Sequence, residues 1–164
     1  VFRNSVNWRP VEQFGIGVSA QYEHSNAWVL WQEGQQFTSF DTNQWRPNLN
    51  LSYFLSAKQQ LRLSAQWVGI KARERRFYEL ESASKRLVER AKVGAGSDDF
   101  AISSLALQFR YQWEIAPLSE LFLVYTLNGY QSVTESSFGD LLDSAYKNPS
   151  NEDIVLKLRY RLGS

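Results

Sequence analysis

The sequence contains no cysteine and a single histidine. The missing thiols exclude disulfide bonds and thiolate metal sites, and one imidazole cannot build a histidine-rich metal centre. No apolar run approaches the roughly 18 residues that a membrane-spanning helix requires. The formal net charge is only +1, so the chain has no strong field that would recruit nucleic acid.

The chain is nevertheless rich in aromatic residues, which make up 15% of it, while its mean hydropathy is −0.41. A sequence that is polar on average and still carries many Trp, Tyr and Phe residues suits a sheet with two different faces. A membrane barrel with a watery lumen is one such sheet.

Alternation of apolar and polar residues predicts antiparallel β-strands along most of the chain. The stretch "ALQFRYQWEIAPLSELFLVY" (106–125) is the clearest case, with a turn at "APLS" between two strands. Seven segments alternate in this way: one ending near Trp8, then 14–22 (extendable to Trp31), 44–55, 61–67, 105–113, 121–125 and 154–162.

The connections between these segments alternate between short and long. The short ones are 9–13, 56–59 and 116–119, and the long ones are 32–43, 71–99 and 131–152. Outer-membrane barrels have tight periplasmic turns and extended outside loops. A soluble sandwich has no reason to sort its connections in this way, so the pattern favours a barrel.

Charged and amide side chains within the strands occupy the parity opposite to the apolar residues. In a barrel this parity faces the lumen, and the expected lumen-facing residues are Arg62, Gln66, Gln108, Arg110, Gln112, Lys157, Arg159 and Arg161. A basic lining would favour anions in an open channel, or would hydrogen-bond a plug or an N-terminal domain. Both options stay open.

Four aromatic residues are expected at the membrane interface, where amphipathic rings gather. They are Trp45, Trp67, Trp113 and Tyr160. The alternative is that these rings cap the core of a soluble sandwich.

The strand count carries an expectation about completeness. If the short turns are periplasmic, the last strand ends in the periplasm and the first begins outside the cell. Single-chain bacterial barrels have an even number of strands. Seven strands therefore predict the C-terminal part of a larger barrel, whereas one undetected strand would allow an eight-stranded barrel. The absence of an initial methionine and of a signal peptide fits a removed leader or a longer protein.

Two stretches carry a family resemblance, "LQFRYQWEIAPLSELFLVYT" and "IVLKLRYRL", supported by "LSAKQQLRLSAQW" (55–67). The matching residues are Arg110, Tyr111, Trp113, Pro117, Ser119, Leu121, Phe122, Val124, Tyr125, Lys157, Leu158, Arg159 and Tyr160. The chain resembles Gram-negative outer-membrane proteins of unknown function that carry an N-terminal module like carbohydrate-binding family 9 and a C-terminal β-barrel. The resemblance covers most of the chain but only the barrel part of that family. It implies an outer-membrane location.

The remaining motifs are weak. "GIGVSA" (15–20) fits a dinucleotide fingerprint but lies inside an alternating strand, so its small residues are expected to face a crowded lumen or to relieve sheet curvature. His24 has Glu23 and Ser25 as neighbours, which would point to the opposite face, and a surface position is preferred over a catalytic triad. The acidic pairs at 98–99, 140–143 and 152–153 lack calcium-loop spacing.

The charged stretch 71–92 has apolar residues near helical spacing and predicts a short amphipathic helix. Such a helix would either contact lipopolysaccharide phosphates or a partner, or be solvated and held by ion pairs between successive turns, which is the preferred interpretation.

Together these observations predict an all-β protein, an antiparallel up-and-down transmembrane β-barrel segment of the Gram-negative outer membrane. We expect no catalysis, cofactor or metal. The expected role is a membrane anchor, channel or docking barrel for an N-terminal ligand-binding region. Its expected partners are the lipid bilayer, lipopolysaccharide, and further strands or subunits of a larger barrel. The alternative is a soluble, lectin-like all-β binding module.

Overall fold

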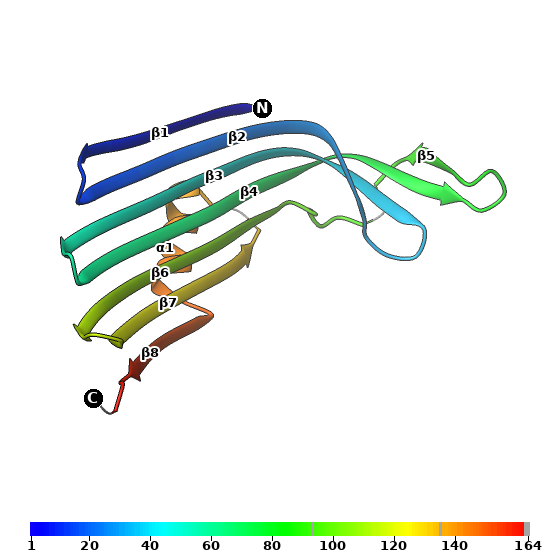
Figure 1. Ribbon diagram of the computed structural model, residues 1–164. Helices are drawn as coiled ribbons and strands as arrows, with labels where there is room; N and C mark the ends of the chain where they lie inside the picture. The colour runs from blue at the N-terminus through cyan, green and yellow to red at the C-terminus, as the bar shows by residue number, and fades with distance from the viewer. Residues whose placement is uncertain (93, 135, 163–164) are drawn as a thin grey trace.

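The computed structural model describes residues 1–92, 94–134 and 136–162. Within them the chain forms one antiparallel sheet of eight strands and one helix (Figure 1). The elements are β1 (Phe2–Val11), β2 (Phe14–Trp31), β3 (Gln36–Ser56), β4 (Gln59–Glu81), β5 (Arg86–Arg90), β6 (Phe100–Ala116), β7 (Ser119–Val133), α1 (Phe138–Lys147) and β8 (Asn151–Arg159). The prediction of an all-β antiparallel architecture is confirmed.

The sheet is open, so the chain does not form the eight-stranded barrel that one undetected strand would have allowed. Its neighbours follow the order β1-β2-β3-β4-β6-β7-β8, and β5 pairs only with the outer part of β4. Seven strands thus alternate in direction across the sheet, so the edge strands β1 and β8 run the same way. Antiparallel closure requires an even number of strands. These seven therefore cannot close on themselves with antiparallel pairing throughout.

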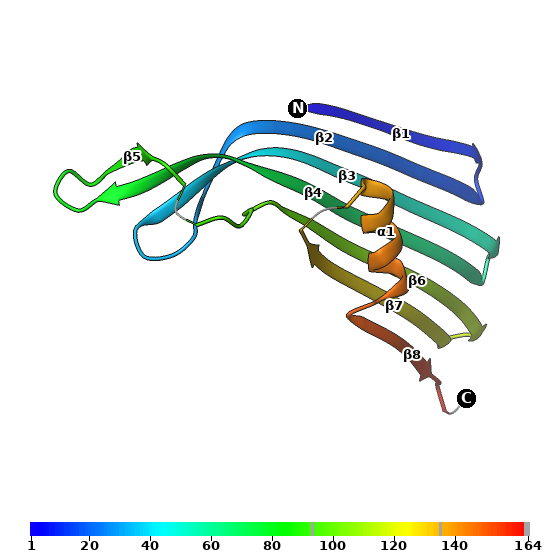
Figure 2. The ribbon, with the colours of Figure 1, turned by 180° about the vertical axis from the view of Figure 1, so that it is seen from behind.

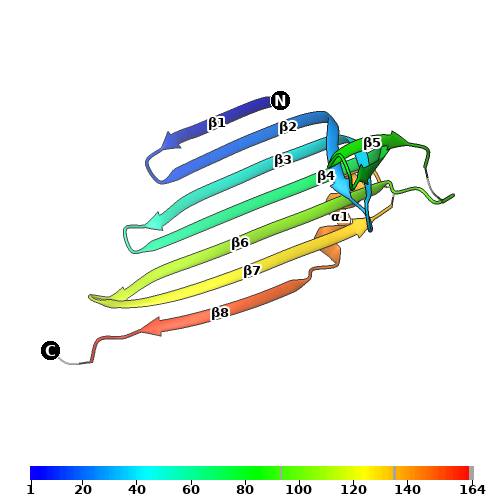
Figure 3. The ribbon, with the colours of Figure 1, turned by 90° about the vertical axis from the view of Figure 1, so that its right-hand side faces the viewer.

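Three tight turns lie together at one end of the sheet (Figure 3). They consist of residues 12–13, 57–58 and 117–118. The connections at the other end are longer, and the one between β7 and β8 contains α1. The first and last strands differ from their predicted bounds, because β1 continues to Val11 and β8 begins at Asn151 and ends at Arg159.

The register aligns the alternating apolar residues of neighbouring strands on one face. One row of cross-strand partners consists of Trp8, Ile16, Leu51, Leu63, Phe109, Tyr125 and Ile154. The adjacent row, one residue along each strand, consists of Asn7, Gly17, Asn50, Ser64, Gln108, Thr126 and Asp153. Successive side chains of a strand point to opposite faces, so the sheet has an apolar face and a polar face.

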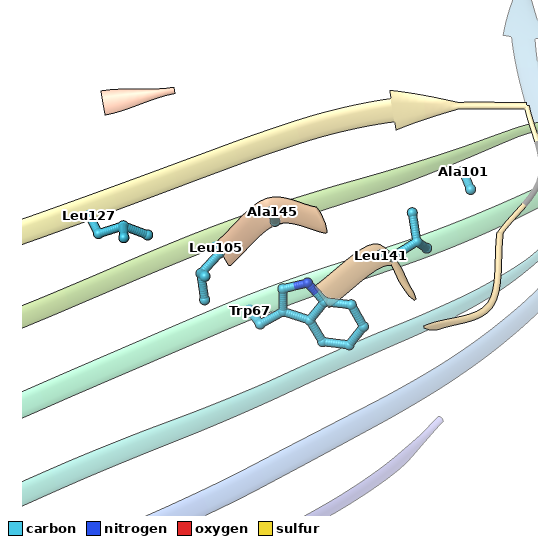
Figure 4. Packing of buried hydrophobic residues seen from close by; sticks show 6 residues of the cluster. All are labelled: Trp67, Ala101, Leu105, Leu127, Leu141 and Ala145. Atoms are coloured by element: carbon cyan, nitrogen blue, oxygen red, sulfur yellow. The ribbon is translucent and has the colours of Figure 1, made fainter. Parts of the chain in front are cut away.

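Helix α1 covers part of the apolar face, across β4, β6 and β7 (Figure 2). Ser137 caps its N-terminus by accepting a hydrogen bond from the Asp140 amide. Leu141 and Ala145 of the helix are buried against Trp67, Leu105 and Leu127 (Figure 4). A polar loop was expected here, without a helix.

Glycine lets α1 approach the sheet closely. A Cβ atom on Gly129 would lie 1.9 Å from the carbonyl oxygen of Ala145. A Cβ on Gly69 would lie 2.4 Å from the indole ring of Trp67. The two glycines therefore leave the space that the helix backbone and the indole occupy.

The outer parts of β3 and β4 correct two sequence predictions. Residues 36–43 belong to β3 instead of a polar connection, and 71–81 continue β4 and pair with β3 and β5. The predicted helix within 71–92 is therefore wrong. Ladder hydrogen bonds to two neighbours outweigh the weak helical spacing.

A second, smaller core supports this outer region. Phe40 is fully buried and packs edge-to-face against Phe100 at 5.2 Å between ring centroids, and Trp28 lies 6.0 Å from the same ring. Register irregularities between Ser25 and Trp28 and between Ser39 and Phe40 occur at this level. Such irregularities bend strands, and Figure 1 shows the strands bending here.

Within the described ranges, no helix combines the length and the apolar character needed to cross a membrane.

Candidate functional site

The candidate site is an open hollow of about 860 Å³ on the polar face. Five strands, β1, β2, β3, β4 and β6, contribute to its lining. The polar groups that face it include Asn7, Asn50, Ser52, Ser64 and Gln108. Its volume falls in the usual range of small-molecule sites, about 300–1,000 Å³.

Two glycines of β2 make room for polar side chains that line the hollow. A Cβ atom on Gly17 would lie 2.7 Å from the side-chain oxygen of Asn7, and one on Gly15 would lie 3.1 Å from the Ser52 hydroxyl. Both glycines lie within β2 and are not followed by a helix. The dinucleotide fingerprint therefore lacks the helix N-terminus that would hold a pyrophosphate.

Two arginines stand side by side in this hollow. Arg62 of β4 and Arg110 of β6 are direct cross-strand partners. The Nε of Arg110 donates a 2.6 Å hydrogen bond to the side-chain oxygen of Gln108. Among the described residues, no carboxylate lies within 4.0 Å of either guanidinium group. Like charges placed opposite each other destabilise a sheet, so this pair favours binding of an anion.

Gln108 also lines the hollow, whereas Gln66, Gln112, Lys157 and Arg159 lie on the same face outside it. Arg159 is the cross-strand partner of Glu120. The Glu120 carboxylate accepts a 3.3 Å hydrogen bond from the Gln112 amide. Lys157 lies opposite Phe122. Gln66 lies between Asn48 and Ala106 on the neighbouring strands. Arg161 follows the end of β8, and its amide donates to the Ser119 hydroxyl. The expected basic lining thus separates into a central arginine pair and a group on and after β8.

The four aromatic candidates also separate. Trp45, Trp113 and Tyr160 are exposed, with Tyr160 at 58%. Trp67 is only 8% exposed, lies under α1 and donates to the Ser103 hydroxyl. Trp67 is therefore a core residue beneath the helix, and its expected place at the membrane interface stays a prediction.

His24 lies near the outer end of β2, away from the hollow. Its Nδ1 is 3.3 Å from the Asp41 carboxylate and 3.3 Å from the Asn43 side-chain oxygen. Over residues 1–92, 94–134 and 136–162, no three His, Asp or Glu side chains gather closely enough to hold a metal ion.

A carboxylate network holds the segment after β5 onto β4. Glu74 accepts a 2.7 Å hydrogen bond from the Asp98 amide and forms an ion pair with Lys92, while Asp99 accepts a 2.6 Å hydrogen bond from the Glu74 amide. The Asp98 amide and then Lys92 lower the pKa of Glu74 below its ordinary value of 4.5. Asp98 and Asp99, considered above as calcium ligands, serve this network.

Asn7, Asn50 and Ser52 were not among the predicted site residues, although they occupy the same polar face as Arg62 and Arg110. The short and irregular pattern near Trp8 does not reveal how β1 pairs with β2, so the sequence could not bring Asn7 to this site.

Comparison with known proteins gives one match. The sequence model of a family described as "Domain of unknown function (DUF5916)" matches residues 2–163. Neither the curated proteins nor the solved structures include a match to the chain. The match covers nearly every residue of the chain, which therefore belongs to the DUF5916 family, a domain of unknown function.

Proposed function

We propose that this chain forms part of the wall of a β-barrel in the outer membrane of a Gram-negative bacterium. Its apolar face contacts lipid and its polar face lines a lumen. Its role is non-catalytic: it anchors the protein and supplies a channel or docking surface for a ligand-binding region.

The spacing of aromatic residues on β2 and β3 carries the proposal. Phe14 and Tyr53 are cross-strand partners with rings 6.3 Å apart, and Tyr22 and Trp45 are cross-strand partners with rings 5.1 Å apart. On each strand the two aromatics are eight residues apart, and the apolar-face residues between them are Ile16, Val18, Ala20, Pro47, Leu49 and Leu51.

The apolar residues between the two aromatic pairs form a lipid-facing band, and the height of this band fits a membrane. Eight residues cover about 26 Å at about 3.3 Å per residue. A strand tilt of about 40° reduces this to about 20 Å, close to the apolar band of about 25 Å between the aromatic girdles of outer-membrane barrels. The strands that bear the band contain 18 and 21 residues, so they extend beyond it.

The exposed edges also support a larger barrel. Apart from α1, no second layer covers the apolar face among the described residues, and the side chains of β8 are exposed along its whole length. Among the strands that the structure describes, β1 pairs only with β2, and β8 pairs only with β7. Long uncovered edges with apolar side chains promote uncontrolled strand pairing. Further strands between β8 and β1 would satisfy both edges and close the ring.

Helix α1 is compatible with this arrangement. It lies over the ends of β6 and β7 away from the tight turns, beside Gly129, and leaves Leu142 and Tyr146 exposed. At this level the proposed bilayer meets water, where helices with an apolar stripe are stable. In the competing soluble binding module, α1 would instead begin a second protein layer.

The test uses purified protein with and without detergent. A barrel wall is expected to need detergent, to float with phospholipid vesicles in a density gradient, and to migrate differently on a gel before and after boiling. A protein that is monodisperse without detergent and stays at the bottom of the gradient would support the soluble module and overturn the proposal.

A further inference from the structure

We propose that the hollow around Arg62 and Arg110 binds a small hydroxylated oxyanion, of the class of sugar acids. The inference uses only the polar face of the sheet. It therefore stands or falls independently of whether the apolar face meets lipid.

The arginine pair supplies the charge. The two residues are cross-strand partners on the polar face, and both line the hollow. Planar guanidinium groups bind carboxylates through two parallel hydrogen bonds. The Gln108 side chain accepts from the Nε of Arg110 at 2.6 Å, which restrains that side chain and leaves its terminal nitrogens to donate elsewhere.

The surroundings suit hydroxyl groups more than a second charge. Beside the arginines, the polar lining consists largely of amides and hydroxyls, those of Asn7, Asn50, Ser52 and Ser64 among them. Each can donate or accept a hydrogen bond. A third arginine, Arg9, lies in the β1 part of the lining, where its guanidinium donates to the Glu12 carbonyl oxygen. A sugar acid presents one carboxylate and several hydroxyls, which matches the Arg62–Arg110 pair and the amides and hydroxyls near it.

The probe is glucuronate, compared with glucose, in calorimetric titrations of the full chain at low salt. We expect glucuronate to bind at least tenfold more tightly than glucose and to be displaced by inorganic phosphate. Equal binding of the two sugars, or no binding of glucuronate, would overturn the proposal.

Variants assign the binding to this hollow. Arg62→Gln and Arg110→Gln should each weaken glucuronate binding at least tenfold. Arg46→Gln is the matched control, because Arg46 lies on the polar face of β3, is bonded to Gln44 and does not line the hollow. It removes the same charge and should change the affinity less than twofold. An equal loss in all three variants would indicate a general charge effect and overturn the site.

Arg62→Lys separates binding from folding. This variant keeps the charge in the sheet but loses the planar fork, so it should fold like the parent chain and still weaken glucuronate binding. Unchanged affinity in folded Arg62→Lys would contradict recognition by paired guanidinium groups. A chain that binds glucuronate but fails to float with vesicles would retain this site while refuting the barrel.

Discussion

The indole nitrogen of Trp67 donates a 2.8 Å hydrogen bond to the hydroxyl of Ser103, and both side chains are buried beneath α1. The two residues lie on adjacent strands, β4 and β6. A buried indole N–H needs a partner, so this bond fixes the ring on which the helix rests.

Ser103→Ala should leave the Trp67 N–H unpaired and lower the free energy of unfolding by about 1–3 kcal/mol. Urea unfolding followed by tryptophan fluorescence measures the change. Ser104→Ala is the control, because Ser104 is exposed and points to the other face. Equal stability of the two variants would mean that the bond does not support the core.

Gly129→Ala should displace α1. The added Cβ would lie 1.9 Å from the Ala145 carbonyl oxygen, which is helix backbone and cannot rotate away. Overpacking of this kind costs about 1–3 kcal/mol. We expect faster amide hydrogen exchange throughout α1.

The control for this substitution is Gly139→Ala, inside α1 itself. A Cβ there meets only the Ser137 hydroxyl, at 3.7 Å, and alanine favours a helix over glycine. Exchange in α1 should be unchanged or slower. Slower exchange in Gly129→Ala would show that the helix does not rest on that glycine.

Acid should weaken the attachment of Asp98 to β4, which depends on the Glu74 carboxylate. Glu74 lies five residues beyond Gly69 along β4, outside the proposed lipid-facing band. Because its pKa is lowered in the folded chain, its stabilising effect is present above the ordinary value of 4.5 and is lost as the pH falls through the lowered value.

The amide of Asp98 reports this change, since it donates to the Glu74 carboxylate. Its protection from hydrogen exchange should fall in acid, after correction for the intrinsic pH dependence of exchange. In Glu74→Gln the protection should be low and should no longer change over that pH range. A Gln variant that keeps the parent's pH dependence would assign the effect to another group.

Much of the fold follows from alternation. Leu61, Leu63, Ala65 and Trp67 alternate with polar residues, and so do Leu105 to Trp113, because one face of each strand meets apolar surroundings and the other meets water. Wherever that contrast exists, the sequence predicts both the strand and the face of each side chain. The arginine pair could be placed on the polar face for this reason.

Alternation fails where both faces of a strand are polar. Residues 71–76, "KARERR", join β4 through ladder bonds to β3, with Phe40 and Ala72 as the few apolar supports. The sequence does not show which segments pair here, so the charges and the near-helical spacing of a few apolar residues suggested a solvated helix. Conversely, Phe138, Leu141, Leu142, Ala145 and Tyr146 have helical spacing, with Ser137 as a cap. That signal was present within a stretch read as a polar loop.

The pairing of Arg62 with Arg110 depends on the register of β4 against β6. Parity places both side chains on one face, but only the alignment of the two strands makes them neighbours and separates them from Arg159. Alignment depends on turn geometry and on the packing of the whole sheet.

The central claim is that the apolar face of this sheet contacts lipid while the other face contacts water. Val18 and Ser19 are consecutive residues of β2 on opposite faces, and the sequence has no cysteine to interfere with labelling. Spin labels on Val18→Cys and Ser19→Cys, in protein reconstituted into phospholipid vesicles, can be compared for collisions with oxygen and with a water-soluble nickel chelate. We predict that the label at 18 collides mainly with oxygen and the label at 19 mainly with the chelate. Preference for the chelate at position 18, or protection from both reagents there, would contradict the claim.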